Sequence, residues 1–127
     1  MTQYNPPGAP ASAPLSESDS RMWATLVHVG GIIIGFVSPL IGYLVMRDRS
    51  QFVREHSATA LNFQITMAIA HVINTVLVFV TLGLWGLIAW LVALAIWIVT
   101  IVFSIIAAMA ANKGEPYKYP LSFPFAT

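Results

Sequence analysis

The chain has 127 residues, which is enough for one domain, and its composition departs from that of soluble proteins. Hydrophobic residues make up 57% and charged residues 9% of the sequence, whereas a soluble globular protein carries about 25% charged residues. Residues 56–112 include no Asp, Glu, Lys or Arg, and a bilayer is the solvent that suits such a run. The absence of cysteine excludes disulfides and thiolate metal sites, and the net charge of +1 gives no indication of nucleic acid binding. We therefore expect an all-α integral membrane protein.

The N-terminal part of the chain predicts a tail followed by one membrane span. Residues 1–20 are rich in Pro and Ala and are expected to be disordered. Residues 22–46 carry no charge, and as a helix of about 37 Å they are long enough to cross a hydrocarbon core of about 30 Å once. Asp19 and Ser20 suit the start of this helix. Pro39 predicts a kink in it after Gly35.

The remainder of the chain predicts a hairpin of two further spans. Residues 47–55 form a polar connection, in which Ser50 can cap the next helix. The uncharged run that follows is too long for one crossing, and two glycines beside a tryptophan make residues 82–86 the place for a turn. The second and third spans are then residues 57–82 and 85–111. The predicted fold is a membrane domain of three transmembrane helices over residues 21–113.

The distribution of basic residues predicts the orientation of these three spans. Arg21 alone lies on the side of the N-terminus and the 82–86 turn, whereas five Lys or Arg residues lie on the side of the 47–55 loop and the C-terminus. Basic residues are enriched in cytoplasmic segments. We therefore expect a cytoplasmic 47–55 loop and C-terminus, with the N-terminus outside.

Small residues recur on one face of two of the predicted spans. In membranes, helices approach closely over such residues. We interpret the stripes as seams for packing within the chain, although one seam could instead face another protein. The predicted packing residues are Gly31, Gly35, Ser38 and Gly42 in the first span and Ala93 and Ser104 in the third.

Polar residues also fall within the spans, and they are expected to point inward and pair. The set comprises His28, Asn62, Thr66, His71 and Asn74. A hydrogen bond among His28, His71 and Asn74 is one expected contact. Helix-to-helix hydrogen bonding is the favoured role, and a proton or ion path along the second span is the alternative. A metal site on His28, His56 and His71 is disfavoured because their spacing gives no helical ligand pair, so no metal and no cofactor is expected. No catalytic motif is present, and we expect no enzyme.

The tail after the third span, residues 114–127, is rich in Pro and aromatic residues. Three prolines keep the residues before them out of the helical region, so the segment is expected to run extended. It either anchors the third span at the membrane interface or folds back onto residues 52–62. In the second case, Glu115 would lie near Arg54 and a tail tyrosine near His56, within a cytoplasmic surface. That surface would comprise Arg47, Arg49, Phe52, Arg54, Glu55, His56, Tyr117 and Tyr119.

Several short motifs carry a resemblance to a known family. They are Trp23 with His28, the sequence FVREH at residues 52–56, ALNFQ at 60–64 and GEPYKYPL at 114–121. Over about residues 21–125 the chain resembles the Tic20-like family of small bacterial membrane proteins, which is mostly classified as a domain of unknown function. The resemblance implies a multi-span protein of the bacterial cytoplasmic membrane without known catalysis, and at most a part in protein translocation. The related chloroplast import component has four spans, whereas a fourth span here would require a break at Pro39.

The function predicted from these features is non-enzymatic. We expect a small subunit or assembly factor of a membrane complex, linked to protein translocation through the resemblance. The alternative is a small oligomeric transporter or channel with a polar path along the second span. The expected partners are the lipid bilayer and either another membrane protein or further copies of this chain.

Overall fold

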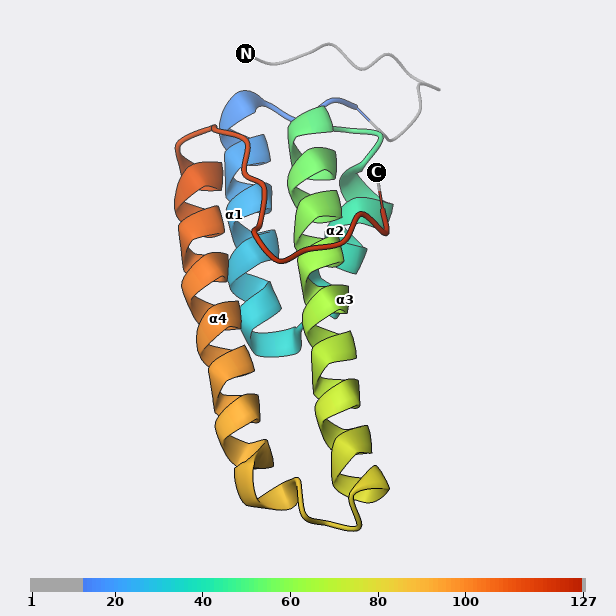
Figure 1. Ribbon diagram of the computed structural model, residues 1–127. Coiled ribbons are helices and arrows are strands. Elements are labelled where there is room, and N and C mark those ends of the chain that lie inside the picture. Colours follow the sequence, from blue (N-terminus) through green and yellow to red (C-terminus); the bar gives the residue numbers. More distant parts are fainter. Residues whose placement is uncertain (1–12, 127) are drawn as a thin grey trace.

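The computed structural model describes residues 13–126. Within them the regular secondary structure is all helical, and the last helix is followed by an extended C-terminal tail. The helices are α1 (Glu17–Ile34), α2 (Val37–Met46), α3 (Gln51–Val80) and α4 (Gly86–Asn112). As Figure 1 shows, α3 and α4 form a long antiparallel hairpin, and α1 and α2 form a shorter one that packs against its upper half. The all-α prediction is confirmed. Residues 1–12 of the predicted disordered tail, and residue 127, lie outside the described residues.

The first apolar run does not form one span, and this prediction was wrong. Helix α1 ends at Ile34, and the chain reverses over Gly35 and Phe36 before α2 begins at Val37. Pro39 has no N–H to donate to the Gly35 carbonyl four residues earlier, and its ring would clash with that carbonyl in a continuous helix. In α2, Pro39 instead occupies the first turn, where a missing N–H costs nothing. Gly35 makes the reversal with φ of 63°, a value that favours glycine.

This reversal brings the N-terminal end of α1 next to the connection between α2 and α3. The Leu15 N–H donates to the Arg49 carbonyl at 2.8 Å, and the Ser20 and Ser50 hydroxyls share a 2.8 Å hydrogen bond. The end of α4 and the tail lie at the same end of the molecule (Figure 1). The start of α1 and the 47–55 loop therefore lie at the same end of the molecule and not on opposite sides as predicted, and three transmembrane helices are not confirmed.

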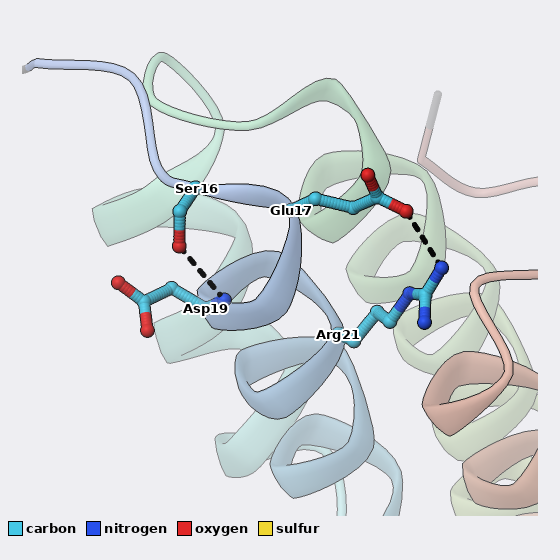
Figure 2. A network of polar contacts seen from close by, with 4 residues as sticks. All are labelled: Ser16, Glu17, Asp19 and Arg21. Carbon is cyan, nitrogen blue, oxygen red and sulfur yellow. Dashed lines mark hydrogen bonds and ion pairs between the residues drawn. The ribbon is translucent and has the colours of Figure 1, made fainter. Parts of the chain in front are cut away.

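Helix α1 begins earlier than the sequence predicted, at Glu17. Ser16, and not Asp19 or Ser20, is its N-cap, and the Ser16 hydroxyl accepts a 3.1 Å hydrogen bond from the Asp19 N–H (Figure 2). One turn later, Glu17 and Arg21 form an exposed ion pair at 2.6 Å (Figure 2). Residues 17–20 therefore belong to the helix and not to the tail.

The hairpin of α3 and α4 agrees with the prediction for the second half of the chain. Ser50 caps α3 as expected, since its hydroxyl accepts a hydrogen bond from the Val53 N–H at 3.2 Å. The chain then turns over residues 81–85, where Gly83 has φ of 90°. Helices of 30 and 27 residues measure about 45 and 40 Å. Both are long and apolar enough to cross a membrane, whereas the 10-residue α2, at about 15 Å, reaches only half-way through a core of about 30 Å.

Two of the predicted packing glycines lie in close contacts between helices. A Cβ on Gly31 would lie 2.8 Å from Nε2 of Gln64 on α3, and a Cβ on Gly42 would lie 2.5 Å from Cγ2 of Val27 on α1. Gly35, by contrast, has nothing within 4 Å of a Cβ position. Its predicted packing role was wrong, because it serves the turn between α1 and α2.

The other predicted packing residues lie at different depths. The Ser38 hydroxyl donates to the Val27 carbonyl at 3.0 Å and so joins α2 to α1. Ser104 is fully buried on α4, whereas Ala93 is only half-buried where α4 extends beyond the shorter hairpin. The core of the molecule therefore lies in its upper half, where four helices meet.

Candidate functional site: a histidine relay beneath the C-terminal tail

The C-terminal tail folds back over the helices and is fixed by polar side chains. Residues 115–126 contain no helix, as predicted, and the tail crosses in front of α3 (Figure 1). The Thr66 hydroxyl accepts a hydrogen bond from the Phe123 N–H at 3.1 Å. Asn62 pairs with both backbone groups of Ala126, accepting from its N–H at 2.6 Å and donating to its carbonyl at 3.0 Å. Asn62 and Thr66, predicted as intramembrane polar residues, therefore pair with the tail.

Beneath the tail, three side chains form a continuous line of hydrogen bonds. Nε2 of His56 lies 2.8 Å from the Glu115 carbonyl, and Nδ1 of the same ring lies 2.8 Å from Nε2 of His28. The Nδ1 atom of His28 in turn contacts the Tyr119 hydroxyl. We call His28, His56 and Tyr119 the histidine relay. It joins α1, α3 and the tail.

The Glu115 carbonyl fixes the direction of every hydrogen bond in the relay. A carbonyl only accepts, so Nε2 of His56 carries a proton, and in a neutral ring its Nδ1 is then an acceptor. His28 must therefore donate through Nε2 and accept through Nδ1, which leaves the Tyr119 hydroxyl as the donor. Each bond has one donor and one acceptor with both rings neutral. The relay is thus fully satisfied without any charge.

Burial supports this uncharged arrangement. His28 and His56 are each 1% exposed and Tyr119 is 3% exposed. The Tyr119 ring stacks on Phe63 with centroids 4.2 Å apart. Burial raises the pKa of the Tyr119 phenol well above its ordinary value, so the hydroxyl keeps the proton that it donates. Burial also raises the pKa of Tyr117, although less strongly.

Two expectations about these residues were wrong. His56 and Tyr119 were assigned to a cytoplasmic surface made by the folded-back tail, but both are buried beneath that tail. A bond from His28 to His71 or Asn74 was also expected. Because α1 reverses at Gly35, His28 instead lies level with the first turns of α3, far from the second half of that helix.

The remaining predicted polar residues lie in the lower half of the molecule. Asn74 fixes the hairpin turn by donating to the Ala89 carbonyl at 3.1 Å and accepting from the Trp85 indole at 2.8 Å. His71 is half-buried and lines a cavity of about 170 Å³ together with Gln64 and Thr100. These residues do not join the histidine relay.

The rest of the predicted surface lies at the end of the molecule that carries the connection between α2 and α3. Arg47, Arg54 and Glu55 are exposed there. Phe52, Arg49 and Tyr117 are half-buried, and Nε of Arg49 donates to the Ala13 carbonyl at 2.8 Å. The Glu115 side chain is exposed, and the expected contact of Glu115 with Arg54 is replaced by its carbonyl bond to His56.

Charge is concentrated at that same end. All six basic and five acidic residues of the chain lie in residues 17–21, 47–55 and 113–118, and these segments come together there. The 81–85 turn at the opposite end carries no charge. This clustering was not predicted from the sequence, because α1 was expected to cross the membrane. The signal that could have revealed it is the spacing of Gly35 and Pro39.

The chemistry that the relay offers is hydrogen bonding and proton exchange. Within residues 13–126, no three His, Asp or Glu side chains are grouped so that they could hold a metal ion. Both nitrogens of each relay histidine are already used in hydrogen bonds. The relay therefore attaches the tail to α1 and α3.

Comparison with known protein families assigns the chain to one of them. The model of the MamF/MmsF family, described as the magnetosome magnetite crystal formation protein family, matches residues 19–126. The chain belongs to this family. The resemblance to the Tic20-like family was therefore wrong, and the link to protein translocation has no support. No curated protein and no solved structure matches the chain.

The region matched by the family model covers both the helices and the histidine relay. The matched region begins in α1 and ends in the tail, so it includes all three relay residues. Together with the length and apolar character of α3 and α4, it indicates a membrane location. The family description connects this membrane protein with magnetite crystal formation in magnetosomes.

Proposed function

We propose that the chain is a non-enzymatic component of the magnetosome membrane that supports magnetite crystal formation by binding another membrane protein. The observation that carries the proposal is the docked tail. It packs over α3 through hydrogen bonds with Asn62, Thr66 and His56, so that it forms one surface with the charged end of the molecule. A surface of this kind suits the binding of a partner better than it suits catalysis.

In the proposed orientation, the charged end faces the cytoplasm. With the start of α1 and the tail at that end, all six Lys and Arg residues lie on one side of the membrane and none lies in the 81–85 turn. The preference of basic residues for the cytoplasmic side then favours a cytoplasmic N-terminus as well as a cytoplasmic tail. The short uncharged turn would face the magnetosome interior. It offers no carboxylate to iron or to a mineral surface, so an effect on crystals would act through a partner.

The transporter alternative has less support. A polar path along α3 would need free polar side chains, but Asn62 and Thr66 are bonded to the tail and Asn74 is bonded within the hairpin turn. His71 is the polar residue of this set that remains beside a cavity. A single half-buried imidazole does not make a continuous pathway.

The orientation is tested by cysteine labelling, since the chain has no cysteine of its own. In sealed magnetosome vesicles, whose outer surface is cytoplasmic, a membrane-impermeant maleimide should label D48C and should not label L82C until detergent is added. Labelling of L82C but not D48C in sealed vesicles would contradict the proposed orientation.

The function is tested by releasing the tail without disturbing the helices. The double variant N62L/T66V removes three hydrogen bonds to the tail and keeps side chains that suit α3. T75V is the matched control, because Thr75 bonds only to the His71 carbonyl of its own helix. Each variant should replace the native copy in a magnetite-forming host, with equal protein in the membrane.

We expect smaller magnetite crystals with N62L/T66V than with T75V, measured by electron microscopy. Limited proteolysis of the tail in isolated membranes shows whether it has been released. Crystals of normal size despite a protease-sensitive tail would contradict the proposal.

A further inference from the structure

An apolar groove runs along the outside of the molecule between α2 and α3. It has a volume of about 510 Å³, and every side chain that lines it is hydrophobic. The walls are formed by Phe36 directly before α2, by Leu40 in α2 and by the α3 residues Leu61, Ile65, Ala68, Ile69, Val72 and Ile73. The groove exists because α2 is short, since the reversal at Gly35 leaves the second half of α3 uncovered on this side.

The length of the groove matches one leaflet of a bilayer. From Leu61 to Ile73, α3 rises by about 18 Å. Half of a hydrocarbon core is about 15 Å thick. The groove therefore has the length and the lining that suit a single acyl chain lying parallel to the helices.

Both walls of the groove lead to an arginine at the charged end. On α2, the helical spacing that contains Phe36 and Leu40 continues through Tyr43 to Arg47, and the Arg47 guanidinium lies over the Tyr43 ring at 5.6 Å. On α3, the spacing that contains Leu61 and Ile65 leads back to Arg54 in the first turn.

Neither arginine is neutralised by an acidic residue. Arg47 and Arg54 are exposed, and within residues 13–126 neither forms an ion pair. The other two arginines are already engaged, Arg21 with Glu17 and Arg49 with the Ala13 carbonyl. Two guanidinium groups without an ion-pair partner in the described residues therefore lie beyond the end of an acyl-sized groove, at the charged end of the molecule.

We propose that this groove is a binding site for an anionic phospholipid, with one acyl chain between α2 and α3 and the phosphate held by Arg47 and Arg54. A guanidinium pairs with phosphate oxygens in a bidentate manner, and basic residues at the membrane surface favour anionic over zwitterionic lipids. A protein helix in the groove would leave both arginines without a counter-charge. The bound lipid would hold the α1–α2 hairpin against α3, beside the surface formed by the tail.

The test measures lipid binding to the purified full-length chain in detergent by native mass spectrometry. Dioleoylphosphatidylglycerol and dioleoylphosphatidylcholine have the same acyl chains and differ in headgroup charge. The double variant R47Q/R54Q is compared with K113Q/K118Q, which removes the same charge at two positions that do not line the groove. A68F fills the groove, and A95F adds the same bulk to an exposed position of α4.

We expect the wild-type chain to bind phosphatidylglycerol more tightly than phosphatidylcholine. Each lost arginine should weaken phosphatidylglycerol binding about fivefold, and so R47Q/R54Q about 25-fold. K113Q/K118Q and A95F should bind as the wild type does, whereas A68F should lose binding although its helicity by circular dichroism is unchanged. Equal affinity for the two lipids, or equal losses in the two charge variants, would overturn the proposal in favour of unspecific annular lipid.

Discussion

Replacing Tyr119 with phenylalanine tests the direction of the hydrogen bonds in the histidine relay. The variant keeps the ring that stacks on Phe63 and removes only the hydroxyl that donates to Nδ1 of His28. Because the Glu115 carbonyl fixes the protonation of both histidines, Nδ1 of His28 must be an acceptor. The variant leaves this buried atom without a donor.

The expected loss of stability follows from the burial of that atom. His28 is 1% exposed, so water cannot replace the missing donor, and a buried polar atom without a partner costs about 1–3 kcal/mol. Y117F is the matched control. Tyr117 is half-buried, and its hydroxyl has no hydrogen bond to the described residues, so the expected change is within about 0.5 kcal/mol.

The measurement is the free energy of unfolding in mild detergent, followed by circular dichroism during a reversible denaturant titration. Proteolysis of the tail gives a second readout, because Tyr119 joins the tail to α1. Equal stabilities of Y119F and Y117F, together with equal protection of the tail, would refute the directed relay.

Two further predictions concern packing and pH. Gly42→Leu should destabilise the fold by about 1–3 kcal/mol, because even a Cβ at this position would lie 2.5 Å from Cγ2 of Val27. The denaturant titration described above measures this change in the free energy of unfolding, and a neutral effect would contradict the close contact. Burial raises the pKa of Tyr119 above 10.0, so the folded chain keeps a proton that the unfolded chain loses above that pH. The contribution of Tyr119 to stability should be constant below about pH 10, and stability should fall above that pH by up to about 1.4 kcal/mol per pH unit, with a shallower fall in Y119F.

The hairpin of α3 and α4 could be predicted because its signals are local. A long uncharged run must turn back, and Gly83 beside Trp85 marks the only suitable place. The cap at Ser50 and the end of α4 before Gly114 follow from equally local rules. The extended tail followed from its prolines in the same way.

The first apolar run was harder to predict because one proline permits two outcomes. Pro39 can kink a continuous helix or begin a new one, and both satisfy the local backbone. Here the second outcome gains the close contact of Gly42 with Val27 and the hydrogen bond of Ser38 to the Val27 carbonyl. Those contacts form only after the chain has reversed, so the sequence pattern around Pro39 does not contain them.

The histidine relay was missed for a related reason. His28 and His56 come from different helices, and Tyr119 lies 91 residues after His28 in the sequence. Their pairing depends on the depth at which α1 turns. With α1 across the membrane, His28 would face the second half of α3, which is why His71 and Asn74 were expected as its partners.

The polar residues in the first half of α3 are explained by the tail that they hold. A chain segment without helical hydrogen bonds must find other partners near a bilayer, since water is scarce there. His56, Asn62 and Thr66 face the tail and form hydrogen bonds with its backbone at Glu115, Ala126 and Phe123, respectively. The tail in turn supplies Tyr119, which completes the hydrogen bonds of His28 on α1. The split of the first apolar run and the polar face of α3 thus belong to one arrangement, because the relay forms only when α1 turns back at Gly35.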